Sequence, residues 1–310
     1  WQLARESRMD CVAVLSRGVI EVKEFRRLKK GDLVAVGRSE DGSNGIYVHA
    51  TAFTQPESQG EESFAFRQGR SRETAYAMDY DSIYDLLRYE KEHGGHITWV
   101  LGPACCFDWD ARHAFAKLVH GGYVQAVLAG NALATHDLEA GYRSTALGQD
   151  IYTQISQPGG HYNHIDTINQ VRKAGSIEKF GAEQNIQDGI MAACVQCKVP
   201  YVLTGSIRDD GPLPEVYADV YEGQNAMRDQ VKKSTTVICL ATTLHSIATG
   251  NMTPSYRVLA DGTVRPVYFY SVDVSEFAVN KLRDRGSLAV KTIVTNVQDF
   301  IVNVQRGLSL

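Results

Sequence analysis

The sequence predicts an α/β protein: a doubly wound, mostly parallel sheet preceded by a small β-rich module. From His96 onward, short apolar runs alternate with helical patterns, as expected for parallel strands that are buried on both faces and joined by helices. Before residue 55, short β-like runs are separated by turn signals. We therefore expect a β-rich module at residues 1–75 and a sheet domain at residues 76–310.

The first module contains four candidate strands, at residues 11–15, 19–22, 33–36 and 46–48. Lys30-Gly31-Asp32 and the stretch from Asp41 to Gly45 separate them, and such Gly- and Asp-rich segments are typical of turns. Residues 55–75 are polar and fit a linker or an ordered surface loop. Residues 79–93 carry apolar side chains at helical spacing and end at Gly94-Gly95, a common helix stop.

Six apolar runs provide the strands of the predicted sheet, at residues 97–101, 124–129, 201–204, 237–241, 267–272 and 292–297. Helical patterns accompany them, at residues 110–119, 166–173, 214–228, 275–283 and 299–306. Strands and helices that alternate in this way form βαβ units, which assemble into a doubly wound sheet. Residues 254–265, with Asp261-Gly262 near their centre, fit a hairpin inserted before the fifth strand.

Composition and charge exclude several classes of protein. The chain has 310 residues, of which 44% are hydrophobic and 22% charged, with a net charge of −4. These values are typical of a globular protein and disfavour nucleic acid and anionic membranes as partners. No apolar stretch reaches the ~18 residues of a membrane helix, and the first residues do not form a signal peptide. Six cysteines in a chain of this length do not make a disulfide framework, so we expect a cytoplasmic location.

Two groups of potential metal ligands lack the spacing of a metal site. Cys194 and Cys197 form a CxxC pair, but no second pair and no adjacent histidine accompany them. His161 and His164 lie in the string Gly-Gly-His-Tyr-Asn-His without a third ligand nearby, which fits a polar loop beside a substrate pocket better than a metal centre. We therefore predict no metal site.

The stretch from Tyr201 to Pro212 is the clearest candidate for a functional site. An apolar run of strand length ends abruptly in three charged residues, Arg208, Asp209 and Asp210. In open parallel sheets ligands bind beyond the carboxyl ends of the strands, so a charged cluster there indicates a site. The alternative is an ordinary solvated loop. The site is favoured because several other predicted strands also end in polar residues.

The ends of the last three strands favour a bound dinucleotide. Thr242 to His245 form a strand-to-helix turn whose amide groups could face a pyrophosphate. Asp273 ends the next strand, where the ribose diol of NAD is usually held, and the final strand ends in Asn296-Val297, where an adenine could lie. The alternative role for Asp273 is to cap the helix that begins at Ser275. The usual G-x-G-x-x-G fingerprint is absent from the sequence.

Five strings of the sequence resemble one family, namely GNALATHDLE (130–139), GGHYNH (159–164), SIRDDGPLP (206–214), LATTLHSIATGN (240–251) and KLRDRGS (281–287). They resemble the ornithine cyclodeaminase family of archaea and the C-terminal half of cyanobacterial arginine dihydrolase–ornithine cyclodeaminase fusions. This region is also linked to lysine-ketoglutarate reductase/saccharopine dehydrogenase (LOR/SDH) enzymes. The resemblance extends from Met9 to the C-terminus, and it implies that the β-rich module is truncated at its start.

The resemblance implies a Rossmann-like domain that binds NAD at the strand ends. The cofactor-binding residues that it implies are Asn131, Ala132, Asp210 (with Asp209 as the alternative), Thr242, Thr243, Leu244, His245, Asp273, Asn296 and Val297. The implied reaction converts L-ornithine to L-proline and ammonia. NAD takes a hydride from Cα, the δ-amine attacks the imine, ammonia leaves, and the hydride returns to the cyclic imine.

Four residues are candidates for catalytic roles by residue type and position. The guanidinium of Arg208 suits a bidentate grip on the substrate carboxylate, and an ion pair with Asp209 or Asp210 is its structural alternative. Asp209, Asp210 or His245 suits the general base that moves protons between the substrate nitrogens.

Two other functions remain open on the sequence alone. One is an NAD-dependent amino-acid or imino-acid dehydrogenase that releases NADH in each cycle, and the other is a non-catalytic NAD-sensing module of a fused arginine-degrading enzyme. The expected partners are ornithine, further copies of the chain in a homo-oligomer, and an arginine dihydrolase domain that is fused or lies upstream.

Overall fold

The computed structural model describes residues 7–47, 76–259, 261–283 and 289–310. A small antiparallel sheet comes first, in the order β2-β1-β3, with β1 at Cys11–Ser16, β2 at Val19–Glu24 and β3 at Leu33–Val34. The fourth predicted strand of this module is reduced to a single bridge between Asp41 and Tyr47, and Val48 lies outside the described residues. The predicted linker at 55–75 also lies outside them, so the module boundary at residue 75 stays a prediction.

The main sheet has seven parallel strands in the order β14-β13-β10-β4-β5-β8-β9. Their bounds are β4 Ile97–Leu101, β5 Ala126–Gly130, β8 Tyr201–Thr204, β9 Val216–Tyr217, β10 Thr236–Leu240, β13 Tyr268–Asp273 and β14 Ala289–Val294. The predicted doubly wound architecture is confirmed. The last strand ends earlier than predicted, at Val294, because Asn296 caps the following helix. The edge strand β9 falls in a stretch predicted as helix, because its pairing with β8 overrides local helical preference.

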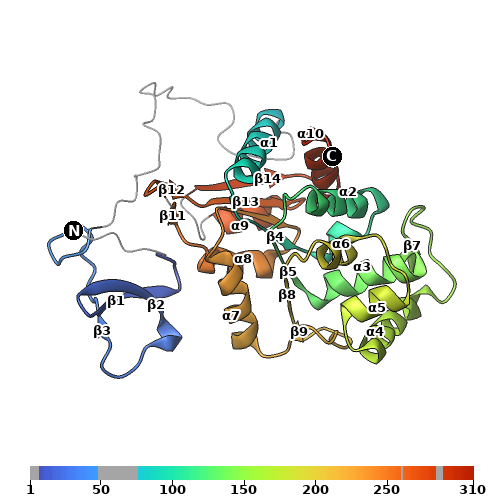
Figure 1. Cartoon of the computed structure of the whole chain (residues 1–310), viewed down its shortest axis with the longest axis horizontal. Helices are drawn as coiled ribbons and strands as arrows, with labels where there is room; N and C mark the ends of the chain where they lie inside the picture. Colours follow the sequence, from blue (N-terminus) through green and yellow to red (C-terminus); the bar gives the residue numbers. More distant parts are fainter. Residues whose placement is uncertain (1–6, 48–75, 260, 284–288) are drawn as a thin grey trace.

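Helices cover both faces of this sheet (Figure 1). Their bounds are α1 Ala77–Glu92, α2 Trp109–His120, α3 Asn131–Arg143, α4 Asn163–Ala174, α5 Ile177–Glu183, α6 Ile190–Gln196, α7 Val220–Val231, α8 Thr243–Met252, α9 Glu276–Arg283 and α10 Val297–Gly307. α1, α10, α2 and α6 pack in a row on one face, whereas α7, α8 and α9 pack on the other. The hairpin expected around Asp261 is confirmed as β11 (Tyr256–Val258) paired with β12 (Val264–Pro266).

Alternate residues of the central strands face the two helical layers. In β4, Trp99 and Leu101 belong to the core beneath α1, α2 and α10, whereas Val100 belongs to the core beneath α7 and α8. All five residues of β4 are buried, and each aliphatic or aromatic side chain of this size contributes about 1.5–3 kcal/mol when fully buried. The continuous apolar runs in the sequence therefore reflect burial on both faces, as predicted.

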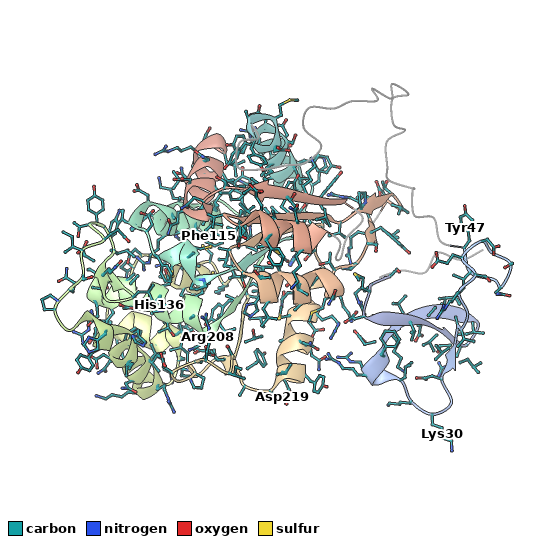
Figure 2. All side chains as sticks on the ribbon, turned by 180° about the vertical axis from the view of Figure 1, so that it is seen from behind. Lys30, Tyr47, Phe115, His136, Arg208 and Asp219 are labelled. Atoms are coloured by element: carbon teal, nitrogen blue, oxygen red, sulfur yellow. The ribbon has the colours of Figure 1, made fainter. Side chains whose placement is uncertain are left out.

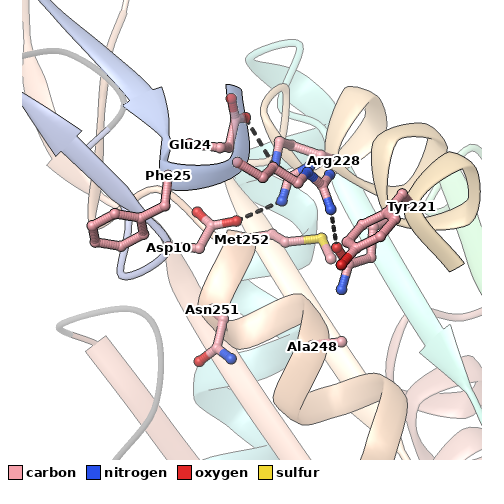
Figure 3. Close-up of a pocket in the computed structure, with 10 residues that line it drawn as sticks. Asp10, Glu24, Phe25, Tyr221, Arg228, Ala248, Asn251 and Met252 are labelled. Atoms are coloured by element: carbon pink, nitrogen blue, oxygen red, sulfur yellow. Dashed lines mark hydrogen bonds and ion pairs between the residues drawn. The ribbon is translucent and has the colours of Figure 1, made fainter. Parts of the chain in front are cut away.

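The small sheet is fastened to α7 by buried ion pairs around Arg228 (Figure 3). The guanidinium of Arg228 lies 2.5 Å from Oδ2 of Asp10 and 3.1 Å from Oε1 of Glu24, and the same Glu24 oxygen accepts a hydrogen bond from Arg8 at 2.9 Å. Burial alone would raise the pKa of Asp10 and of Glu24, yet hydrogen bonds and the nearby arginine charges hold both below their ordinary values. Both carboxylates therefore stay charged between the module and the sheet domain.

A short helical turn of the small module adds contacts to the same helix. Arg26 and Arg27 lie in the turn Phe25–Arg27, and both donate to Oδ1 of Asn225 on α7, at 2.6 and 2.8 Å. Beside these contacts, a cavity of about 250 Å³ lies between the small module and the sheet domain, lined by Phe25 from the module and Tyr221 from α7. Polar and charged groups thus hold the small module on the sheet domain.

Three further findings concern the described residues. None of their helices is long and apolar enough to cross a membrane. They contain no group of three or more histidine, cysteine or acidic side chains placed to hold a metal ion. The six cysteines are free thiols, and burial raises the pKa of Cys105 and of Cys239 to about 12.

Replacing Arg228 should destabilise the whole chain. Arg228→Ala leaves Glu24 and Asp10 with one cation fewer in a buried setting, and removal of one partner from a buried ion pair typically costs about 3–5 kcal/mol. We expect a loss of this order in the free energy of unfolding, measured by urea titration. Arg172→Ala, at an exposed position on α4, is the control and should change stability by less than ~0.5 kcal/mol. Equal stability of the two variants would contradict the role of Arg228.

Candidate functional site

The sheet has a topological switch point between β4 and β10. From β4, chain order continues through β5, β8 and β9 on one side and through β10, β13 and β14 on the other. The connection after β4 therefore leads to α2 on one face, and the connection after β10 leads to α8 on the opposite face. Loops that diverge in this way open a crevice at the carboxyl ends of the strands, where ligands bind in doubly wound sheets.

Backbone segments approach closely at the switch point. The N–H of Gly102 donates to the carbonyl of Leu240 at 2.8 Å, and a Cβ added to Gly102 would lie 2.0 Å from the carbonyl oxygen of Ala241. Ala241 itself adopts a φ of 48°, in the left-handed region that non-glycine residues rarely occupy. Only glycine fits at position 102, and the crevice floor is a constrained piece of backbone.

The predicted turn from Thr242 to His245 begins α8 at the edge of this crevice. Thr242 is the N-cap but makes no side-chain cap bond, and Thr243 and Leu244 of the first turn are exposed, Leu244 to 76%. The ring of His245 lies between two hydroxyls, with Nε2 at 2.7 Å from Thr204 Oγ1 and Nδ1 at 3.3 Å from Thr242 Oγ1. Burial lowers the pKa of His245, although the nearby Asp209 opposes this. His245 thus links the ends of β8 and β10 as a neutral imidazole.

Asp273 and Asn296 lie at the ends of neighbouring strands and contact backbone amides. Oδ1 of Asp273 accepts a hydrogen bond from the N–H of Ser275 at 2.9 Å, so the capping alternative is observed in part. Asn296 accepts from the N–H groups of Gln298 and Asp299, which makes it the N-cap of α10. Val297 is buried as the first residue of that helix. The expectation that Asn296-Val297 ends a strand is therefore wrong, because the cap begins the helix there.

Asn131 fastens the charged loop after β8. Asn131 is the first residue of α3 and is buried, and its side chain donates to the carbonyl of Gly211 and accepts from the N–H of Leu213, both at 3.0 Å. Asp209 accepts a hydrogen bond from the N–H of Ser206 at 2.8 Å within the same loop. Among the residues that the structure describes, neither Asp209 nor Asp210 forms an ion pair with Arg208. The guanidinium of Arg208 is exposed.

A cavity of about 360 Å³ lies beside the switch point and collects part of the predicted set. Its lining comprises Pro103, Phe107, Asn131, Ala132, Thr135, His136, Leu147, His164, Ile168, Arg208, Asp209 and Asp210. The structure thus brings Asn131 and Ala132 together with the Arg208–Asp210 run, as predicted, and Figure 2 labels His136 and Arg208 at this site. Thr242 to His245, Asp273, Asn296 and Val297 do not line it, because they lie at or beyond the ends of β10, β13 and β14.

One face of α3 supplies titratable residues that were not predicted. Ala132, Thr135, His136 and Glu139 are spaced as i, i+3, i+4 and i+7, which places them on one side of a helix. Nδ1 of His136 lies 2.8 Å from Oε2 of the fully buried Glu139. The other carboxylate oxygen accepts from the Thr145 hydroxyl at 2.8 Å and from the Gly148 N–H at 3.2 Å. This helical spacing of polar residues within GNALATHDLE was the signal that could have revealed the pair.

Asp137 fixes the rotation of α3 from its opposite side. Its Oδ1 lies 2.7 Å from Nε of the buried Arg112 on α2, and its two oxygens accept from the N–H groups of Ile190 and Met191, at the start of α6. These three contacts tie α3 to two neighbouring helices, so the Ala132–Glu139 face is held toward the cavity.

Comparison with known proteins identifies the family. Residues 81–304 match the family model described as the C-terminal Rossmann-fold domain of ArgZ-like arginine dihydrolases. The chain belongs to this family. The ornithine cyclodeaminase of Methanocaldococcus jannaschii is 41% identical over 97% of this chain and 69% of that protein. The resemblance inferred from the five strings is confirmed.

Cyanobacterial relatives and proteins of known structure are also similar to this chain. The bifunctional arginine dihydrolase/ornithine cyclodeaminase AgrE of Nostoc is 32% identical over 97% of this chain and 41% of its own length. A solved LOR/SDH protein of Methanococcus maripaludis is 36% identical with a TM-score of 0.87, covering 98% of this chain and 87% of that one. The ternary complex of AgrE with ornithine and NAD⁺ is 31% identical with a TM-score of 0.70, covering 97% of this chain and 40% of AgrE.

Gly102→Ala should destabilise the protein through the switch point. The added methyl overlaps the Ala241 carbonyl, and such overpacking typically costs about 1–3 kcal/mol. Gly181→Ala is the matched control, because Gly181 lies inside α5 with nothing within 4 Å of an added Cβ. It should raise stability by ~0.5–1 kcal/mol, since alanine has the higher helix propensity. The free energy of unfolding of both variants tests this. A Gly102→Ala variant as stable as the wild type would contradict the close approach of Gly102 to the Ala241 carbonyl.

Proposed function

We propose that this chain is an NAD-dependent ornithine cyclodeaminase that converts L-ornithine into L-proline and ammonia. The observation that carries the proposal is the cavity at the switch point, where a guanidinium, two carboxylates and two imidazoles line one space. Relatives named ornithine cyclodeaminase, at 36–41% identity over nearly the whole chain, support it, as does the solved complex of AgrE with ornithine and NAD⁺.

The strand ends fit a dinucleotide. The exposed first turn of α8 offers the amides of Thr243 and Leu244. Oδ1 of Asp273 bonds to Ser275, and among the described residues its other carboxylate oxygen has no hydrogen-bond partner. Asn131 and Asn296 already use their side chains within the protein, so contact from them would come through the backbone or an adjacent group such as Ala132. When bound, NAD supplies a hydride acceptor for the oxidation at Cα and returns the hydride in the final step.

The cavity fits ornithine by charge. Arg208 has no ion-pair partner among the described residues and can bind the substrate carboxylate through its planar fork. Asp209 and Asp210 line the same cavity and can face the two ammonium groups of ornithine. The apolar side chains of Phe107, Leu147 and Ile168 complete the lining and can pack against the methylene chain. The two ammonium groups and the carboxylate of ornithine are thus each matched by a cavity side chain of opposite charge.

Deuterium labelling tests the reaction. The cycle is redox-neutral, so ornithine deuterated at Cα should give proline that keeps its deuterium, with catalytic NAD and no accumulation of free NADH. Mass spectrometry of the proline and the absorbance of NADH in solution measure the two outcomes. NADH that builds up in step with product would show a dehydrogenase instead. NAD binding without any turnover of ornithine would indicate a sensing module.

Asp273 should set the preference for NAD over NADP, because a carboxylate repels the 2′-phosphate of NADP. Asp273→Ala should weaken NAD binding by ~1.5–3 kcal/mol, the usual strength of a hydrogen bond to a charged group. Asp261→Ala is the matched control: Asp261 accepts the N–H of Thr263 at 2.9 Å, just as Asp273 accepts that of Ser275, but it lies in the hairpin. Calorimetric titration with both cofactors decides, and comparable affinities of the wild type for NAD and NADP would reject this role.

A further inference from the structure

Two histidines that line the cavity each have a carboxylate partner. His136 on α3 is held by Glu139, and His164 on α4 is held by Asp210, with Nε2 of His164 at 3.1 Å from Oδ2. The two ring centres lie 5.9 Å apart, and both rings line the cavity. A substrate with two ammonium groups has two protons to lose and regain, and the cavity has two imidazoles.

The hydrogen bond to Glu139 fixes which nitrogen of His136 can accept a proton. A carboxylate oxygen accepts, so Nδ1 of His136 carries the hydrogen and Nε2 is the basic nitrogen. Among the residues described, no protein group hydrogen-bonds to Nε2. Phe107 contacts the ring edge-on, with centroids 5.4 Å apart, which further fixes the ring plane. Next to His136, the hydroxyl of Thr135 is buried, lines the cavity and has no partner in the described protein.

The two histidines differ in depth. The side chain of His136 is 11% exposed and that of Glu139 is fully buried, whereas His164 and Asp210 are 24% and 64% exposed. His136 also lies one helical turn beyond Ala132 on the same face of α3, where its ring packs edge-on against Phe107. His136 is therefore the more buried of the two histidines, on the side of the cavity from which water is better excluded, and His164 is the one toward solvent.

We propose that His136 and His164 divide the two substrate protons, so that His136 takes the proton of the α-ammonium and His164 that of the δ-ammonium. This inference rests on the proposed function. Loss of the α-proton to His136 leaves a neutral amine, whose Cα–H bond can then be oxidised to an iminium by the NAD of that function. Loss of the δ-proton to His164 lets the δ-nitrogen form its bond to Cα.

The protons and electrons balance over the cycle. After ring closure, a proton moves from the δ-nitrogen to the α-nitrogen, the Cα–Nα bond breaks, and ammonia leaves a cyclic iminium. The two electrons return to Cα with the hydride, which gives proline as a neutral amine. His136 then protonates the departing ammonia, and His164 protonates the ring nitrogen. Ornithine with two ammonium groups thus becomes zwitterionic proline and ammonium, and both histidines end neutral.

A single-turnover experiment separates the two roles. His136→Asn keeps an amide near Nδ1 to donate to Glu139 but has no base at Nε2. Mixed with NAD and ornithine, it should reduce bound nicotinamide about 100-fold more slowly than wild type, because general base catalysis contributes 10²–10⁴-fold. His164→Asn should reduce nicotinamide at the wild-type rate, while proline forms about 100-fold more slowly and the reduced cofactor persists. His93→Asn, at the exposed end of α1, is the control and should leave both rates unchanged.

A binding measurement without NAD gives an independent readout. In the NMR spectrum of histidine-labelled protein, ornithine should shift the imidazole signals of His136 and His164 toward their protonated forms, and the His136 signal should be missing from His136→Asn. Glu139→Gln should slow nicotinamide reduction about 10-fold and move its pH dependence, since Glu139 acts through His136. The other charged or titratable groups that line the same cavity, namely His164 on α4 and Arg208, Asp209 and Asp210 on the loop after β8, are unchanged in that variant.

Several results would overturn the assignment. Reduction of nicotinamide by His136→Asn within about threefold of the wild-type rate would do so, as would slow reduction in His164→Asn. If His136→Asn melts at a lower temperature than wild type, the rate of nicotinamide reduction is measured with His136→Gln instead. If the wild-type chain releases no proline, the proposed function is wrong, and so is the division of protons that rests on it. If the wild type turns ornithine over normally and the histidine variants do so at the same rates, only the roles of His136 and His164 are rejected.

Discussion

The pairing of β4 with β10 is the constraint on which the rest of the structure depends. All seven strands of the main sheet are parallel, and chain order diverges from this central pair. The divergence sends α2 and α8 to opposite faces and leaves a crevice whose floor is the contact of Gly102 with Leu240 and Ala241. Since parallel strands end at one edge, segments far apart in the chain deliver their polar residues to the same place.

Burial of Glu139 organises the cavity wall. A buried carboxylate is costly unless its oxygens are hydrogen-bonded, and Glu139 is satisfied by His136, Thr145 and Gly148. Thr145 in turn accepts from Asn163 at the start of α4. One buried charge therefore aligns a histidine on α3, the turn after that helix, and the beginning of the helix that carries the second histidine. The arrangement holds a basic nitrogen toward the cavity in a fixed orientation.

The polar residues at the strand ends have two kinds of task. Asn131, Asn296 and His245 use their side chains to hold loops and helix starts together. Arg208 is exposed and unpaired among the described residues, and Asp273 has one oxygen bonded to a local amide. A residue whose polar side chain already bonds within the protein contributes to ligand binding mainly by positioning its neighbours. Arg208 and Asp273 keep unused capacity, and they are therefore the residues assigned direct contacts with the substrate carboxylate and the cofactor.

The sequence alone determined the sheet and its functional edge, because apolar runs of strand length and the polar residues that end them are local patterns. It located six of the strands, the hairpin near Asp261, and the Arg208–Asp210 loop. It missed β9, since two residues pair only when β8 lies beside them, and it misplaced the end of the last strand at the Asn296 cap. Only the tertiary structure showed that His136 and His164, 28 positions apart in the sequence, share one cavity. Whether His136 faces this cavity depends on the rotation of α3 about its axis. Arg112 and Asp137 fix that rotation through contacts between helices, which no local sequence pattern reveals.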